Sequence, residues 1–302
     1  MSAAPSMHTT DSAPPVAATS RWFILEGRNL TAAQVQAIAQ LAGAAAVEKV
    51  APQAWRLVPD AALPAPAVLA RMRETAARFG ADINLIARPR LLADYRLAVM
   101  DMDSTLITIE CIDEIADMLG IKPEVAAITE AAMRGEIAYT ESLRRRVALL
   151  KGLDVSTLDR VYDERLRLSP GAETMLAAFR QAGLKTLLVS GGFTFFTDKL
   201  KSRLGLDFTH SNVLGIADGK LTGEVVGPIV DADEKARTLL ATCARLGCAP
   251  EQAIAMGDGA NDLAMMKVAG LSVAYRAKPV VRAQAMTALN HNGLDAALRL
   301  FA

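Results

Sequence analysis

Cysteine, net charge and long apolar runs are all scarce in this 302-residue chain. Its three cysteines are odd in number, and none has zinc-finger spacing with histidine, so we expect no structural disulfides and a cytoplasmic, reducing setting. The 33 basic residues equal the 33 acidic ones, and this balance gives no reason to expect a nucleic acid or a membrane as a partner. No apolar run is long enough to span a membrane, and the N-terminus lacks the pattern of a secretory signal.

The rest of the composition is that of a folded protein. Hydrophobic residues make up 52% of the chain and charged residues 22%, which is ample for a core. The length favours two compact units, or one large unit that carries an insertion. Residues 1–20 are rich in alanine, proline, serine and threonine, and we expect them to form a flexible tail.

Residues 21–90 have a short, self-contained pattern. Segments that favour strands and helices follow in the order strand, helix, strand, strand, helix, strand, and Gly43 and Gly80 end the two helices. This order predicts a small α+β domain of the ferredoxin-like type. No ligand residue stands out in it, so a packing or homo-oligomerisation module is favoured, while a serine-binding regulatory role stays open.

From residue 91 onward, apolar strands alternate with helices. The alternation predicts an α/β fold with a doubly wound, mostly parallel sheet covered by helices on both faces. Residues 216–230 hold glycines among β-branched residues and predict a hairpin. Strands are expected at 95–101, 183–192, 253–259 and 271–275, and helices at 171–182, 193–204, 233–246 and 261–268.

Residues 109–168 interrupt this alternation with helices alone. The first two helices are separated by Gly120 and Pro123, and Thr140 is expected to cap the third. Because the segment lies between the first two strands of the sheet, it should form a helical cap over the carboxyl edge. The catalytic core would then comprise residues 91–108 and 169–302.

Asp101 and Asp103 stand where the first strand of this sheet ends, in "LAVMDMDSTLIT". Alternate side chains of an extended strand share a face, so both carboxylates should point toward the edge where ligands of such folds bind. Two adjacent acids raise each other's pKa unless a cation lies between them. A hard cation such as Mg²⁺ favours oxygen ligands of this kind, particularly in phosphate chemistry.

Polar clusters follow at three later junctions of strands and helices. "SGGF" (190–193) combines a hydroxyl, glycine amides and a helix start, which suit a phosphate cradle. Lys235 opens a later helix, where by itself it would be an ordinary surface lysine. "GDGANDLAMM" places Asp258, Asn261 and Asp262 at another strand end, in what alone would be an Asx-rich turn. Four clusters at successive junctions predict one shared site.

On these motifs the chain resembles the haloacid-dehalogenase superfamily of phosphatases, and within it the phosphoserine phosphatases. The resemblance covers about residues 93–302 and depends on "DMDST", the glutamate of "ITIECIDEIAD", "SLRRRVALL", "VSGGF", Lys235 and "GDGANDLAMM". It implies a Mg²⁺-dependent enzyme that hydrolyses O-phosphoserine to serine and phosphate through an aspartyl phosphate, the last step of serine biosynthesis.

The resemblance also implies a role for each polar residue of the core. Asp101 would be the nucleophile, and Asp103 would protonate the leaving oxygen and then deprotonate the hydrolytic water. Mg²⁺ would be held by Asp101, the backbone carbonyl of Asp103, and Asp258. Asp262 would orient Lys235 or a metal-bound water. The groups around the phosphoryl oxygens would be Ser190, Gly191, Lys235 and Asn261.

Two cap residues point to the substrate. Arg146 falls within an apolar helical stripe, where an unpaired guanidinium is costly, so it needs either an anionic ligand or a salt bridge within the cap. Glu110 opens the first cap helix, where the helix dipole alone favours a carboxylate. In the phosphatases that the chain resembles, these positions bind the carboxylate and the ammonium group of phosphoserine. Met133 and Tyr139 would line the cap side of the same pocket.

Two further functions compete with this interpretation. A phosphatase of the same superfamily could act on another small phosphomonoester, such as a phosphorylated sugar or homoserine phosphate. A signalling receiver domain also has a doubly wound sheet, an aspartyl phosphate and a lysine. Receivers, however, place the phosphorylated aspartate on a middle strand, apart from the acidic pair, and have no helical cap.

Overall fold

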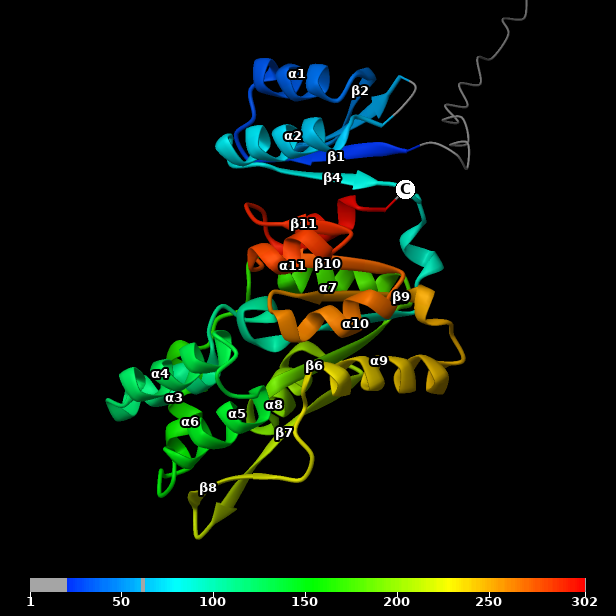
Figure 1. Cartoon of the computed structure of the whole chain (residues 1–302). Helices are drawn as coiled ribbons and strands as arrows, with labels where there is room; N and C mark the ends of the chain where they lie inside the picture. The colour runs from blue at the N-terminus through cyan, green and yellow to red at the C-terminus, as the bar shows by residue number, and fades with distance from the viewer. Residues whose placement is uncertain (1–20, 61–62, 302) are drawn as a thin grey trace, which may run out of the picture.

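Two separate β-sheets organise the chain, a small one at the N-terminal end and a larger one in the remainder (Figure 1). The computed structural model describes residues 21–60 and 63–301. The tail predicted for residues 1–20 lies outside these ranges. In the described part of the chain, no helix has both the length and the apolar character that crossing a membrane requires.

The N-terminal sheet has four antiparallel strands in the order β2-β3-β1-β4. Its first helix begins at a reciprocal cap, in which the Thr31 hydroxyl accepts from the N–H of Gln34 and the Gln34 side chain accepts from the N–H of Thr31. The order of elements confirms the predicted ferredoxin-like domain. These elements are β1 (Trp22–Glu26), α1 (Ala32–Leu41), β2 (Ala44–Ala51), β3 (Ala54–Pro59), α2 (Pro66–Arg78) and β4 (Asp82–Ile86).

The larger sheet has seven strands in the order β11-β10-β9-β5-β6-β7-β8, and every neighbouring pair is parallel except β7 and β8. Its central strand β5 (Leu97–Met100) is apolar on both faces. Leu97 and Val99 pack on one side, with α9, α10 and α11, while Ala98 and Met100 pack on the other, with α7 and α8. A strand covered on both sides is typical of a doubly wound sheet, which confirms the predicted fold class.

The other strands of this sheet are β6 (Lys185–Phe193), β7 (Phe208–Ala217), β8 (Lys220–Val226), β9 (Ala253–Gly257), β10 (Leu271–Tyr275) and β11 (Thr287–Leu289). Its helices are α7 (Ala172–Gln181), α8 (Thr194–Leu204), α9 (Ala232–Leu246), α10 (Leu263–Val268) and α11 (Pro279–Gln284). The apolar pattern did not reveal β11 or the first half of β7. Strand β11 is only three residues long, and β7 begins with the polar run 209–212, which joins β6 through backbone pairing.

Four helices between β5 and β6 form the predicted cap, seen as a lobe beside the core in Figure 1. The chain enters and leaves this lobe through two adjacent extended segments. Ile107 forms an antiparallel bridge with Leu168, and the N–H of Thr108 donates to the carbonyl of Arg167 (2.9 Å). A second attachment lies at the other end of the cap, where the N–H of Gly152 donates to the carbonyl of Leu221 (2.8 Å) and Asp154 forms a bridge with Lys220 of β8. Its helices are α3 (Cys111–Leu119), α4 (Lys122–Met133), α5 (Tyr139–Ala148) and α6 (Ser156–Arg160).

The prediction that Thr140 is the N-cap residue of α5 is wrong. Thr140 lies inside the helix, and Ala138 is the N-cap residue, with an extended backbone and no side-chain hydrogen bond. The carbonyl of Ala138 accepts the N–H of Ser142 (2.9 Å). Tyr139, the first helical residue, lies against Gly191 of the core, and this tertiary contact outweighs the preference of threonine for the cap position.

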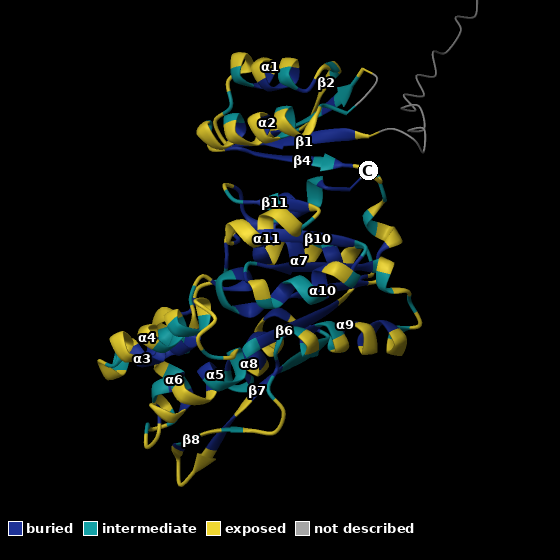
Figure 2. Cartoon of the chain, in the orientation of Figure 1, coloured by how far each residue is buried: buried dark blue, intermediate teal, exposed yellow. Residues whose placement is uncertain are grey.

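The open face of the N-terminal sheet packs on the catalytic core. Trp22, Ile24 and Ile86 belong to the same buried cluster as Tyr95 and the core strands, and the strands at this junction are dark in the burial view (Figure 2). The opposite face of the same sheet holds a second cluster with α1 and α2. Strands β1 and β4 are therefore covered on both faces, whereas the edge strand β2 is mostly exposed.

Polar groups fix the register of this junction. The carboxylate of Asp82 accepts the backbone N–H groups of Asn290 (2.8 Å) and Asn292 (3.2 Å), while Asn84 exchanges two hydrogen bonds with the backbone of Ala288 (2.7 and 3.0 Å). Because each of these hydrogen bonds is directional, the small domain has one preferred position on the core.

Glu26 is a buried carboxylate at this junction. Burial raises its pKa to about 7. Arg299 opposes the shift, while Asp295 and Asp82 reinforce it. A carboxyl group with a pKa raised on folding binds a proton more tightly in the folded chain than in the unfolded one. Its contribution to stability is complete below the unfolded pKa and is lost as pH rises through the folded value.

We expect Glu26→Gln to remove part of the pH dependence of stability. The free energy of unfolding of the variant, relative to the wild type, should increase from about pH 5 to about pH 8, because glutamine has no proton to lose. Chemical denaturation across this range measures the difference, with the exposed Glu173→Gln as a control. Parallel pH profiles for wild type and Glu26→Gln would contradict the buried-carboxyl assignment.

Candidate active site

The predicted site residues of the core meet at the carboxyl edge of the larger sheet. Asp101 follows β5, Ser190 lies near the end of β6, Asp258 follows β9, and Lys235 lies in the first turn of α9. Strands β9, β5 and β6 are direct neighbours in the sheet, so parallel pairing alone places three of these side chains side by side.

Lys235 is the centre of this cluster. It is 0% exposed, and its ammonium nitrogen lies 2.8 Å from Asp101 Oδ2 and 2.7 Å from Asp262 Oδ1. Burial alone would lower the pKa of Lys235, but the two carboxylates outweigh burial and raise it. The pKa of Asp101 is raised to about 8, by burial and by Asp262, with Lys235 opposing both. A lysine in this position supplies a fixed positive charge beside Asp101.

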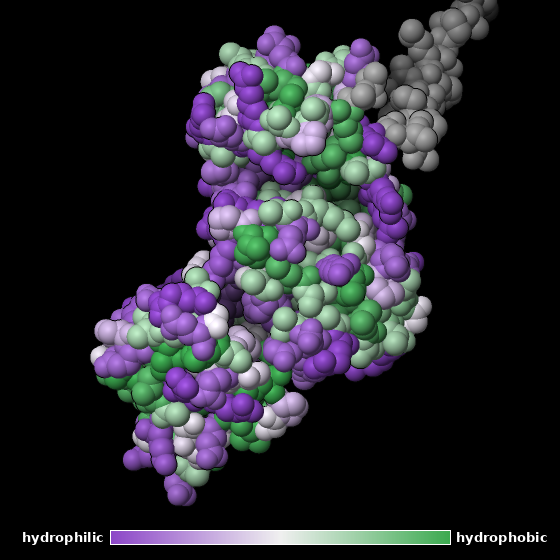
Figure 3. Space-filling view, in the orientation of Figure 1, coloured by the Kyte–Doolittle hydropathy of each residue, from purple (hydrophilic) through white to green (hydrophobic). Residues whose placement is uncertain are grey.

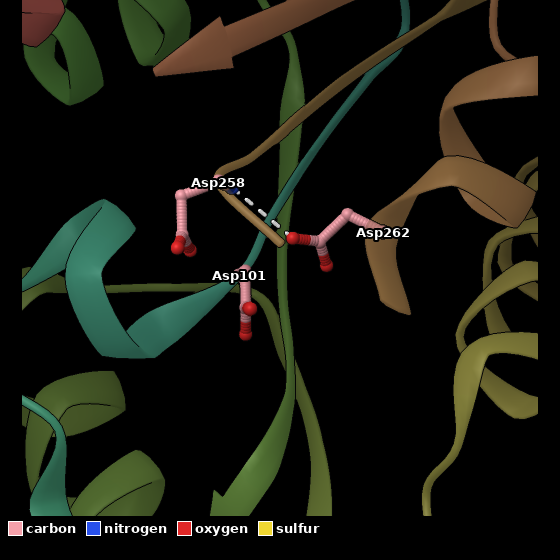
Figure 4. A group of neighbouring side chains, drawn as sticks. All are labelled: Asp101, Asp258 and Asp262. Atoms are coloured by element: carbon pink, nitrogen blue, oxygen red, sulfur yellow. Dashed lines mark hydrogen bonds between the residues drawn. The ribbon is translucent and has the colours of Figure 1, made fainter. Parts of the chain in front are cut away.

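Asp262 is fully engaged within the protein. One oxygen accepts from Lys235, and the other accepts the backbone N–H groups of Asp258 (3.1 Å) and Gly259 (3.0 Å), the first of which is drawn in Figure 4. A side chain at Gly257 would collide with the Asp262 carboxyl group. Glycine at this position therefore lets the loop close around Asp262.

Asp101, Asp258 and Asp262 together offer oxygens that all lie within 4.8 Å of one another (Figure 4). Both oxygens of Asp262 and both of Asp101 have protein partners, but Asp262 accepts three donors, two of them loop amides, whereas Asp258 accepts one hydrogen bond, from the Thr105 hydroxyl (3.1 Å). Asp258 is therefore the most available metal ligand of the three. Burial followed by Asp262 raises the pKa of Asp258 to about 6. The buried Asp101 and the half-buried Asp258 at this separation suit a hard divalent cation. The sequence motif contained Thr105, but nothing in it indicated this contact.

Asp103 reaches the site by a route that differs from the predicted one. Strand β5 ends at Met100, and residues 102–106 form a kinked turn in which the backbone of Asp103 (φ −63°, ψ 136°) and Ser104 is not helical, so Asp103 lies outside the strand. Its carboxyl group is placed by this turn, with Ser104 at φ 54°. Burial, Glu110 and Asp101 raise the pKa of Asp103 well above its usual value. Its Oδ1 is buried with no hydrogen-bond partner in the described part of the chain, which leaves it free for proton transfer.

The segment 190–192 forms a narrow cradle beside Asp101. The hydroxyl oxygen of Ser190 accepts the N–H of Gly192 (2.8 Å), and the side chain of Asn212 donates to the carbonyl of Gly191 (2.7 Å). The other end of the Asn212 amide accepts the N–H of Val230 (2.8 Å) and ties the cradle to the approach to α9. Asn212 was not predicted, because it lies in an unremarkable polar run and only the folded chain brings it to the cradle.

The two glycines of the cradle leave room for neighbouring side chains. A Cβ on Gly191 would collide with the Tyr139 hydroxyl, and one on Gly192 would collide with Met102 and approach Asp103 Oδ2 (3.2 Å). Tyr139 therefore closes the cradle from the cap side. Burial raises the pKa of its hydroxyl to about 12, so this hydroxyl is a hydrogen-bond donor at neutral pH.

The two charged cap residues face this region, and neither makes the interaction that would give it a purely structural role: a helix-capping bond for Glu110 and a salt bridge for Arg146. Glu110 is the N-cap residue of α3, yet its side chain makes no capping bond and instead accepts from the Ser104 hydroxyl (2.6 Å). Arg146 donates weakly to the carbonyl of Ser142 (3.4 Å), and no ion pair of Arg146 occurs within residues 21–60 and 63–301. Its neighbour Arg145 does pair, with Glu141. A salt bridge within the cap therefore does not account for Arg146.

Two of the predicted site residues, Asn261 and Met133, lie at the edge of the site. Asn261 follows the Asp258 loop, and its side-chain oxygen packs against Gly259. Met133, at the end of α4, is 66% exposed. The surface is hollowed between the cap lobe and the core, as Figure 3 shows.

Comparisons with known proteins agree with this arrangement. The sequence profile of the haloacid dehalogenase-like hydrolases matches residues 95–270. A phosphoserine phosphatase from Polaromonas sp. is 60% identical over 234 residues, which cover 76% of this chain and 99% of that protein.

Solved structures extend the similarity to most of the chain. A HAD family hydrolase from Salmonella enterica serovar Typhi superposes with a TM-score of 0.84 at 34% identity and covers 93% of this chain and 98% of its own. A probable phosphoserine phosphatase from Vibrio cholerae, in unliganded form, has a TM-score of 0.80 at 37% identity and covers 97% of this chain and 90% of its own. The chain belongs to the haloacid dehalogenase-like hydrolases and, within them, to the family of the phosphoserine phosphatases.

Proposed function

We propose that this protein is a Mg²⁺-dependent phosphoserine phosphatase that releases serine and phosphate through an aspartyl phosphate on Asp101. The observation that carries the proposal is the pairing of two sets of groups across one cleft. Asp101, Lys235 and Asp258 lie on the core side, and Glu110 and Arg146 lie on the cap side. The names of the relatives support the same substrate.

The first step would be attack of the Asp101 carboxylate on phosphorus. Asp101 Oδ1 accepts the N–H of Met102 (2.7 Å), and Oδ2 pairs with Lys235, so the carboxylate is held in one orientation. Lys235, the Ser190 hydroxyl and the amides of the cradle would stabilise the charge that spreads over the phosphoryl oxygens. The covalent bond forms from Asp101 to phosphorus as the bond from phosphorus to the seryl oxygen breaks.

Asp103 would carry the protons. Its raised pKa favours the protonated form needed to donate to the departing seryl oxygen. The same carboxylate, now deprotonated, would accept a proton from the water that attacks the aspartyl phosphate. The unpartnered Oδ1 of Asp103 leaves one oxygen available for both transfers.

Mg²⁺ fits the carboxylates at this edge of the sheet. Asp101, Asp258 and the backbone carbonyl of Asp103 would hold it, since Asp262 is committed to Lys235 and to the loop amides. When bound, the ion would supply positive charge next to the phosphoryl oxygens and relieve the repulsion between the carboxylates.

The cap would select the substrate. Phosphoserine carries a carboxylate and an ammonium group beside its phosphate, and Arg146 and Glu110 supply the complementary charges. Arg146 has no carboxylate partner of its own, and Glu110 is turned away from its helix, so both are free to bind a zwitterion. Tyr139 would close the pocket above Gly191. Another small phosphomonoester is the alternative substrate.

Release of phosphate from a panel of substrates tests the proposal. The panel comprises O-phosphoserine, homoserine phosphate, a sugar phosphate and an aryl phosphate, each with Mg²⁺ and after treatment with EDTA. We expect the highest kcat/KM for O-phosphoserine and loss of activity in EDTA that Mg²⁺ restores. Equal kcat/KM values across the panel would contradict the assignment of phosphoserine as the substrate and support only a phosphatase of unspecified substrate. Undiminished turnover in EDTA would contradict the proposed dependence on Mg²⁺.

Asp101→Asn should abolish turnover and leave the fold intact, because the amide keeps the shape of the side chain and loses the attacking charge. Circular dichroism and phosphate release measure the two properties. The exposed Asp198→Asn serves as a matched control and should be fully active. An active Asp101→Asn enzyme, or phosphate on the protein that hydroxylamine does not release, would disprove an acyl phosphate at this residue.

Arg146→Ala should impair phosphoserine more than an aryl phosphate. A charge-assisted pair with the substrate carboxylate is worth about 1.5–3 kcal/mol, or roughly a ten- to hundred-fold change in kcat/KM. Arg145→Ala is the matched control, because it removes a guanidinium from the same helix that pairs with Glu141. It should not lower kcat/KM for one substrate more than for the other. Equal losses on both substrates in Arg146→Ala would mean that Arg146 holds the cap together.

A further inference from the structure

A pair of cysteines lies at the far end of α9, away from the active site. The helix ends at Leu246, and Gly247 follows with φ 64° in the left-handed region. The N–H of Gly247 donates to the carbonyl of Ala244 (3.1 Å), and the N–H of Cys248 donates to the carbonyl of Cys243 (3.0 Å). These two bonds define a Schellman motif, in which the side chains at the positions of Cys243 and Cys248 contact each other across the helix end.

The electrostatics of the pair agree with this contact. Burial and the neighbouring Cys248 thiol raise the pKa of Cys243 to about 12. Cys243 is buried among the apolar residues on the α9 side of the sheet, whereas Cys248 is half-buried and reaches the surface. A reagent from solution can therefore meet Cys248 first and Cys243 only through it.

Neither metal binding nor stabilisation explains the pair. No third cysteine, histidine or carboxylate joins it in a metal-binding group among residues 21–60 and 63–301. A disulfide here would close a loop of only six residues, from 243 to 248. Closing so short a loop removes little entropy from the unfolded chain, so a disulfide here would stabilise the fold only slightly. What the geometry offers is a second thiol directly beside any adduct on the first.

We propose that Cys248 and Cys243 are a reversible modification site that takes up low-molecular-weight disulfides by thiol–disulfide exchange. The Cys248 thiolate attacks one sulfur of the small disulfide, forms a mixed disulfide and expels one small thiolate. The Cys243 thiol loses its proton and attacks the Cys248 sulfur, which forms the Cys243–Cys248 bond and expels the second thiolate. Two protein thiols are oxidised, one small disulfide is reduced to two thiols, and the protons leave with those thiols.

The active site stays intact in both forms. Lys235 lies eight residues before Cys243 on the same helix, at a distance of about 12 Å along its axis. Cys111 is buried next to Asp103, and burial with that neighbour raises its pKa well above the usual value. Cys111 therefore serves as an internal control that should not react.

Oxidised glutathione is the probe. The reduced full-length chain is incubated with it, free thiols are blocked with N-ethylmaleimide at acidic pH, and the protein is digested with trypsin. Arg245 separates the two cysteines, so cleavage gives peptides 238–245 and 246–267. We expect these peptides to run as one disulfide-linked species that separates after reduction, and we expect Cys111 to carry N-ethylmaleimide only.

Two variants separate the steps. Cys243→Ala should stop the reaction at a stable glutathione adduct on Cys248, and Cys248→Ser should leave Cys243 unmodified. Phosphatase activity confirms that each variant is folded. A wild-type protein that accumulates the glutathione adduct without linked peptides would overturn the proposal. So would unreacted thiols at Cys248, or a cross-link that involves Cys111.

Discussion

The ammonium group of Lys235, held between the carboxylates of Asp101 and Asp262, is the contact on which the site depends. An unpaired charge at 0% exposure would be very costly, and two carboxylates at 2.7–2.8 Å compensate for that cost. The same contact joins three distant segments: the end of β5, the start of α9 and the loop after β9. Asp262 extends it by accepting two amides of that loop, which places Asp258 opposite Asp101. The charge that positions the proposed nucleophile thus also positions a proposed metal ligand.

Chemistry and selection are divided between two parts of the chain that meet at one edge. The parallel sheet presents the groups that act on phosphorus, because the carboxyl ends of neighbouring strands converge. The cap contributes Glu110, Tyr139 and Arg146. It is joined to the core by the paired segments around Ile107 and Leu168, and also by backbone hydrogen bonds between residues 152–155 and the β7–β8 hairpin. The cap and this hairpin are therefore held together.

The N-terminal domain contributes no residue to this site, yet its position on the core is specific. It places the open face of its sheet on the core and uses Asp82 and Asn84 to pair with backbone groups of the segment 288–292. That segment follows α11, and the N–H of Lys278, just before α11, donates to the carbonyl of Asp258. The domain therefore supports the part of the core that borders the metal ligands.

The sequence by itself determined the fold class and where the chemistry lies. Strands such as β5 and β9 are continuously apolar because both their faces are covered, and polar residues directly after them must lie at one edge of a parallel sheet. Asp101, Ser190 and Asp258 were therefore predictable as neighbours, and the motif around them identified the family. Helix ends with strong local preferences, such as those at Gly43 and Gly80, could also be predicted.

Only the tertiary structure decided which partner each side chain has. The pairing of Asp262 with Lys235 joins residues 27 positions apart, and that of Thr105 with Asp258 joins residues 153 apart. No local pattern encodes such contacts, since they depend on how strands and helices pack. The same reason explains why Asn212 escaped notice and why α5 begins at Tyr139 rather than after Thr140. It also explains why the sequence could not distinguish Arg145 from Arg146. Only the folded structure shows that Arg145 pairs with Glu141 and that Arg146 has no carboxylate partner in the described chain.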